Sequence, residues 1–145
     1  MANATARAFA AYRSAQVETL TQRDLIIRLY QGAEKFLRLA REGMLDRRIE
    51  TAHVNCTKAR DIFQELASTL NFDQGAEIAQ QLKELYLFLI VRITEANLLK
   101  KPEKIDEVLP IIVTLREAWE QVPADLANTT SIPIENEGHA LNFRS

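Results

Sequence analysis

The chain has little of what usually interrupts or cross-links a fold. Its 145 residues include 4 glycines, 4 prolines and a single cysteine, and every proline lies after residue 101. The lone Cys56 excludes an internal disulfide and fits a reducing compartment. Because proline is absent from the first two thirds, long helices can form there without a break.

Excess charge of one sign and long hydrophobic runs are also missing. The net charge is −2, from 18 basic and 20 acidic residues. Nucleic-acid binding needs a concentrated basic face, which this balance does not favour. The longest apolar stretch, residues 85–93, contains Arg92 and is shorter than the roughly 20 residues that span a bilayer. We therefore expect a cytoplasmic protein with no nucleic-acid partner and no direct membrane insertion.

Residues that carry chemistry are few. The chain has two histidines, His53 and His139, and no glycine-rich phosphate loop. His53 and Cys56 are three residues apart, but no second cluster completes a set of four metal ligands. Carboxylates fall at salt-bridging intervals, such as Glu34 and Arg38, which is typical of a solvated helix face. The sequence predicts no enzyme, no cofactor and no metal site.

Apolar periodicity predicts four helices, at about residues 22–46, 48–71, 75–99 and from 102 onward. Pro110 predicts a kink near residues 106–109 of the last helix, or a split into two helices. Short links make sequence neighbours pack antiparallel. We therefore predict an all-α, antiparallel up-down four-helix bundle over residues 21–123. An N-terminal docking or lid segment (1–20) and a flexible C-terminal tail (124–145) would flank it.

The segment 75–99 carries more apolar residues than one core-facing stripe needs. One stripe at three-and-four spacing consists of Ile78, Leu82, Leu85, Leu89, Ile93 and Ala96. Further apolar residues point elsewhere around the helix, namely Leu87, Phe88, Ile90, Val91 and Leu98. A helix that is apolar on nearly all sides must be covered on nearly all sides. Another segment of the chain or a partner is expected to cover the surplus face, with Leu87, Val91 and Leu98.

Short motifs spread over most of the chain carry a family resemblance. They are Phe9 and Tyr12, Leu29-Tyr30-Gln31-Gly32-Ala33, Lys58-Ala59-Arg60-Asp61-Ile62, Glu77-Ile78, Leu85-Tyr86, Arg92-Ile93-Thr94-Glu95-Ala96-Asn97 and Ala118-Trp119. With these motifs the chain resembles the flagellar secretion chaperone FliS family. The resemblance implies a helical bundle that binds the disordered C-terminal segment of flagellin, prevents premature polymerisation and delivers the client to the export gate protein FlhA.

The resemblance also implies partner-binding residues. It points to Phe9 and Tyr12 as client- or lid-related residues, and to helix faces that include Tyr30, Tyr86, Val91 and Asn97. Together with the surplus face, the predicted partner-binding set is Phe9, Tyr12, Tyr30, Tyr86, Leu87, Val91, Asn97 and Leu98. The tail segment Ile132-Pro133-Ile134 is a further apolar piece that could occupy the client groove as a placeholder.

Two alternatives stay open from the residues alone. His53 follows Ala52 as in histidine-phosphotransfer modules, but Cys56 and Thr57 stand where that motif has Lys and Gly. The second alternative is a structural bundle whose surplus apolar surface makes a homodimer. The sequence does not choose between a monomer and a weak homodimer.

Overall fold

A computed structural model describes residues 21–73 and 75–123 of the chain. This part consists of four helices, α2 (Gln22–Leu45), α3 (Ile49–Ser68), α4 (Ala76–Leu99) and α5 (Pro102–Glu120), and it contains no strand. The all-α fold class is therefore confirmed. Phe9, Tyr12 and the proposed lid and tail lie outside the described residues, so their roles stay predictions.

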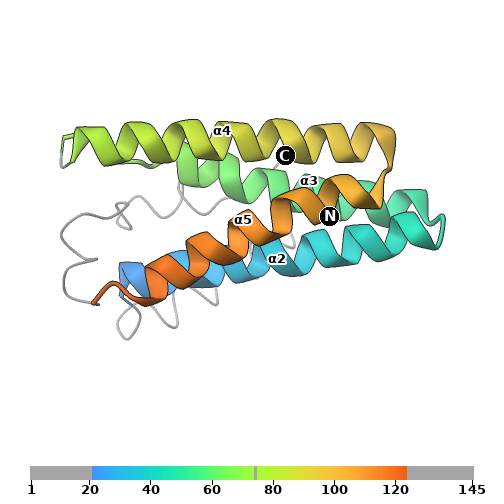
Figure 1. Ribbon diagram of the computed structural model, residues 1–145, viewed down its shortest axis with the longest axis horizontal. Coiled ribbons are helices and arrows are strands. Elements are labelled where there is room, and N and C mark those ends of the chain that lie inside the picture. The colour runs from blue at the N-terminus through green and yellow to red at the C-terminus, as the bar shows by residue number, and fades with distance from the viewer. Residues whose placement is uncertain (1–20, 74, 124–145) are drawn as a thin grey trace.

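The four helices form a ring of neighbours. α2 packs on α3, α3 on α4, α4 on α5, and α5 returns to pack on α2. Figure 1 shows successive helices running in opposite directions, as expected for an up-down bundle. It also shows α4 and α5 close together near their short link and diverging toward the other end.

The size of the buried side chains differs between the close and the divergent parts of the bundle. At the end where the helices approach closely, the buried positions include Ala40, Ala52 and Ala96. Farther from that end along their helices, the large side chains of Tyr30, Phe63 and Tyr86 are fully buried. Small side chains let helix axes approach, whereas aromatic rings need a wider separation. The sequence thus sets where the bundle is narrow and where it is wide.

The helix ends follow local chemistry. Thr21 Oγ1 accepts a hydrogen bond from the Asp24 backbone N–H at 3.0 Å, which caps the N-terminus of α2. α3 ends at Ser68, three residues before the predicted Asn71. There the Thr69 hydroxyl donates to the carbonyls of Glu65 and Leu66 at 3.0 and 3.2 Å. Such side-chain bonds compete with continuation of the helix.

α5 is one helix, and one prediction about burial is wrong. α5 runs from Pro102 to Glu120 with Pro110 inside it, so of the two outcomes predicted at Pro110, a kink or a split, the split does not occur. Pro110 is solvent-exposed, and water can reach the Asp106 carbonyl that loses its helical donor. Ile78, expected in the core stripe of α4, is 65% exposed. It lies in the first turn of α4, where α5 has diverged.

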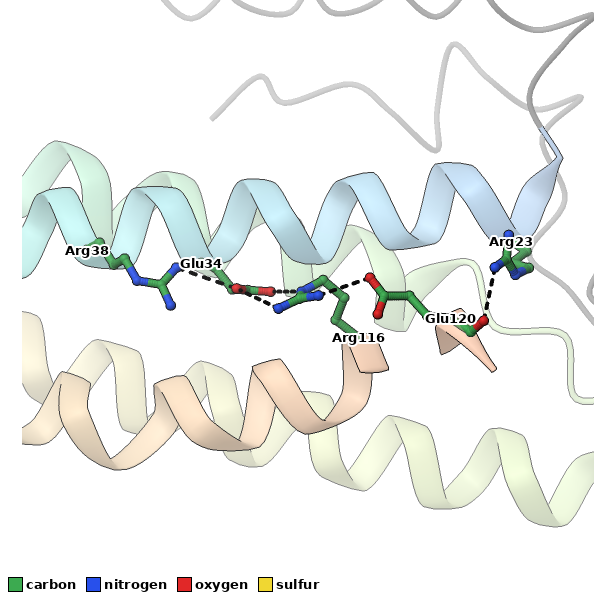
Figure 2. A network of polar contacts seen from close by, with 5 residues as sticks. All are labelled: Arg23, Glu34, Arg38, Arg116 and Glu120. Atoms are coloured by element: carbon green, nitrogen blue, oxygen red, sulfur yellow. Dashed lines mark hydrogen bonds and ion pairs between the residues drawn. The ribbon is translucent and has the colours of Figure 1, made fainter. Parts of the chain in front are cut away.

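An ion-pair network joins α2 to α5 (Figure 2). The Arg116 guanidinium on α5 contacts the Glu34 carboxylate on α2 and the Glu120 carboxylate one turn away. Arg38 reaches the same Glu34 carboxylate at 3.4 Å, and Arg23 donates to the Glu120 backbone carbonyl at 3.0 Å. The network holds the second half of α5 against α2. Within the described residues, no helix has the length and apolar character that crossing a membrane requires.

Candidate partner-binding surface

Three side chains of α4 form an exposed apolar stripe. Leu87, Val91 and Leu98 are 47%, 58% and 78% exposed. Their spacing of four and seven residues places them on one side of the helix. The buried positions of α4, including Leu89, Ile93 and Ala96, face the bundle instead. We call Leu87, Val91 and Leu98 the outer stripe of α4. Its exposure agrees with the sequence prediction, and partner binding by it stays a prediction.

Phe88 and Arg92 widen this surface on one flank. Phe88 is 42% exposed, and the Arg92 guanidinium carbon lies 5.2 Å from the centre of its ring. Arg92 also pairs with Glu95 at 2.9 Å. A guanidinium over an aromatic face leaves N–H donors at the ring's edge. The flank therefore offers both apolar contact and charge to an approaching chain.

Two predicted partner-binding residues require correction. Tyr30 and Tyr86 are 0% exposed and lie in the core, so neither belongs to the accessible surface. Their hydroxyl oxygens are 2.6 Å apart, and the Trp119 indole N–H donates to the Tyr30 oxygen at 3.2 Å. Phe63 packs against both rings. A buried hydroxyl needs a partner, and each tyrosine supplies one to the other across the bundle.

Burial of these hydroxyls changes their acidity. It raises the pKa of Tyr30 to about 12, against the smaller lowering effect of hydrogen bonds from Tyr86 and Trp119. Burial also raises the pKa of Tyr86 well above its usual value, and the neighbouring Tyr30 raises it further. Both groups are neutral phenols at physiological pH. The chain Trp119–Tyr30–Tyr86 therefore links α5, α2 and α4 through neutral hydrogen bonds.

Asn97 lies at the junction of α3 and α4 rather than on the outer stripe. Its side chain is half-buried, and its Nδ2 lies 3.0 Å from Nδ1 of His53 on α3. Lys100 Nζ donates to the Asn97 Oδ1 at 2.9 Å and to its backbone carbonyl at 2.7 Å. Because Lys100 occupies the amide oxygen, the amide N–H₂ faces His53, which puts the neutral ring's proton on Nε2. Asn97 thus fixes the helix junction.

The setting of His53 bears on the phosphotransfer alternative. His53 is exposed, and Lys100 lies on the far side of the Asn97 amide. The sequence motif gave no hint of this lysine, because it comes from another helix. Cys56, on the same helix, is buried and burial raises its pKa to about 11, so it is a poor nucleophile. Among the described residues, no group of three or more His, Cys, Asp or Glu is placed to hold a metal ion.

Glu34 is a polar residue that is far more buried than its salt-bridging spacing with Arg38 predicts. It was expected on a solvated face, but it is 5% exposed and contacts Arg116. The sequence does indicate this burial, because Glu34 is four residues from Tyr30 and three from Leu37 and so lies at the edge of the core stripe of α2. The pairing with α5 could not be inferred from one helix alone.

Comparison with known proteins resolves the family. A family model described as "Flagellar protein FliS" matches residues 4–126. The chain belongs to the FliS family. The match includes α2 to α5 and the sequence motifs of Phe9 and Tyr12, while residues 127–145 lie outside it.

Curated relatives agree with this assignment. FliS of Vibrio cholerae is 30% identical over 82% of this chain and 88% of its own length. FliS of Bacillus subtilis is 32% identical over 78% of this chain and 84% of its own length, and FliS of Salmonella typhimurium is 32% identical over 81% and 91%. Each is named a flagellar secretion chaperone. The family comparisons favour the chaperone hypothesis and lend nothing to the phosphotransfer alternative.

Proposed function

We propose that this protein is a cytosolic, non-catalytic export chaperone for flagellin. It would bind the disordered C-terminal segment of flagellin, prevent premature polymerisation and deliver the client to the export gate protein FlhA. The observation that carries the proposal is the outer stripe of α4, an exposed apolar surface on a chain of the FliS family. Contiguous exposed apolar side chains mark interaction sites.

The shape of the surface suits a segment that folds as it binds. A straight helix with apolar side chains at four- and seven-residue spacing is complementary to a short amphipathic helix or an extended strand. Such a client must order itself on binding, which costs part of the interaction free energy. Apolar contact along much of α4, with Phe88 and Arg92 on its flank, offsets that cost. Phe9 and Tyr12 are proposed to contribute as client or lid residues.

Calorimetric titration with the C-terminal segment of flagellin tests the proposal. We expect saturable binding with a negative heat-capacity change, because apolar surface is buried. The double variant Val91→Ser/Leu98→Ser should weaken binding at least tenfold. Its unfolding free energy should change by less than about 0.5 kcal/mol per site, since both side chains are exposed.

Ile78→Ser is the matched control. Ile78 is also exposed and also on α4, but at about 100° per residue it lies roughly 140° from Val91 around the helix. This variant should leave affinity unchanged. If the wild-type protein shows no binding at tens of micromolar, the client assignment is wrong. Equal losses in the control and the double variant would instead remove the outer stripe from the proposal.

A further inference from the structure

We propose that the chain's own C-terminal segment, residues 131–143, docks on the outer stripe of α4 and competes there with the partner. This inference rests on the proposed function for the identity of the competitor, but not for the docking itself. The segment lies outside the family match, which ends at residue 126. The bundle is complete without it, because α5 ends at Glu120.

The composition of the segment suits an apolar stripe. It contains two apolar pairs at two-residue spacing, Ile132 with Ile134 and Leu141 with Phe143. In an extended backbone, residues two apart project from the same side. Pro133 favours an extended conformation for Ile132 and fixes its own φ. The sequence thus favours a strand-like piece that presents Ile132 and Ile134 together.

The length of the connection permits the docking. α5 has 19 residues, so Glu120 lies about 28 Å along the bundle from the α4–α5 link. Leu98 is the second-last residue of α4 and is therefore next to that link. The outward side of α4 adds one or two helix spacings of about 10 Å. The 12 residues from Gln121 to Ile132 span up to about 40 Å when extended, which is enough.

Charge favours one register. Glu135 and Glu137 lie one and three residues after Ile134, and Lys101 lies two residues after the end of α4. Lys101 is exposed. With Ile132 and Ile134 on Val91 and Leu98, the two carboxylates come near Lys101. The apolar contact and the charge contact therefore point to the same alignment.

A second copy of the chain fits this stripe less well. Stable interfaces use about 20–30 residues on each side, whereas the outer stripe and its flank supply five, Leu87, Phe88, Val91, Arg92 and Leu98. A tethered segment needs far less contact, because its effective concentration is about millimolar. For a segment with an intermolecular Kd of about 0.1 mM, the docked state would then be about ten times more populated than the undocked state.

Thiol labelling of a cysteine placed in the stripe tests the docking without any partner. In the full-length Val91→Cys protein, we expect labelling to speed up about tenfold when Ile132→Asp/Ile134→Asp is added. The native Cys56 is a low background because it is 1% exposed. Thr129→Asp/Thr130→Asp adds the same charge outside the apolar pairs and should leave the rate unchanged. Leu45→Cys, exposed at the end of α2, reports any general change in reactivity.

Each other outcome overturns the inference. Equal Val91→Cys rates with and without the Ile132→Asp/Ile134→Asp change would show that the tail does not cover the stripe. Protection that depends on protein concentration would assign the cover to a second copy. Protection lost in Phe9→Asp but not in the tail variant would assign it to the N-terminal segment.

Client titration then separates the two proposals. Release of the tail should raise the apparent affinity for the flagellin segment about tenfold. While the tail is docked on most molecules, only a small fraction of them has a free outer stripe for the client. If the Val91→Cys thiol is protected from labelling but the protein binds no flagellin segment, the tail docking is supported and the proposed function is wrong. An unprotected Val91→Cys in a protein that binds flagellin would do the reverse.

Discussion

Two glycines of α2 occupy very different surroundings although both are helical. A Cβ on Gly43 would lie 3.0 Å from the Ala52 backbone nitrogen and 3.1 Å from the Arg48 carbonyl oxygen. A Cβ on Gly32 would meet only the tip of the Ile62 side chain, at 3.5 Å. Gly43 therefore permits the close approach of α2 and α3 at their turn, whereas Gly32 does not need to be glycine for packing.

The two sites give opposite predictions for the same substitution. Gly43→Ala should lower the unfolding free energy by about 1–3 kcal/mol, because backbone atoms must move. Gly32→Ala should raise it by up to about 1 kcal/mol, because alanine favours helix and the contact is ordinary. Urea unfolding of both variants measures the difference. A stabilised Gly43→Ala would mean that α2 and α3 are more loosely packed than the distances indicate.

At the scale of helices, α5 is held to α2 by two ion pairs of unequal burial. Arg116 and Glu34 have side chains that are 21% and 7% exposed, whereas Arg41 and Asp106 are 38% and 47% exposed. Breaking a buried pair leaves a desolvated charge without its partner, which is costly. Exposed pairs contribute little, because water and salt screen them.

Removing each arginine in turn should show how much each of the two ion pairs contributes to the unfolding free energy. Arg116→Met should lower the unfolding free energy by about 2–3 kcal/mol, below the roughly 3–5 kcal/mol for a fully buried pair because Arg116 is partly exposed. Arg41→Met, the control, should lower it much less, because water and salt screen the exposed Arg41–Asp106 pair. Replacing Glu34 by Leu in the Arg116→Met background should recover much of the loss. No recovery would indicate that Arg116 acts through packing and not through Glu34.

At the scale of the whole molecule, one chain of hydrogen bonds connects three of the helices, α5, α2 and α4. Trp119 is the only tryptophan, and its indole N–H bonds to the buried Tyr30, which bonds to Tyr86. This chain of hydrogen bonds joins α5 to α2 and α4 in the half of the bundle away from the α4–α5 link. If α5 unfolds with the rest of the bundle, tryptophan fluorescence must report the global transition.

We therefore expect tryptophan fluorescence and far-ultraviolet circular dichroism to give coincident urea transitions. Domains of this size usually unfold in one cooperative step. A fluorescence transition at lower urea would show that the end of α5 opens separately from α2, α3 and α4. Tyr30→Phe keeps the ring but removes the acceptor of the indole N–H, so it should shift both transitions together.

The sequence by itself determined the helices, most of their ends and the family. Caps such as Thr21 and apolar spacings of three and four act within one or two turns, so a single chain segment carries the whole signal. The motif of residues 92–97 likewise lies within one helix. The positions of the four helices and the all-α class therefore needed no tertiary information.

Only the tertiary structure decided the burial of Tyr30, Tyr86 and Glu34 and the exposure of Ile78. Tyr30 and Tyr86 turn inward because each hydroxyl satisfies the other, and Glu34 is buried because Arg116 lies opposite. Ile78 is exposed because it lies in the first turn of α4, at the end of the bundle where α5 has diverged from α4 (Figure 1). Exposure depends on what lies across from a residue, and the spacing within one helix does not contain that information.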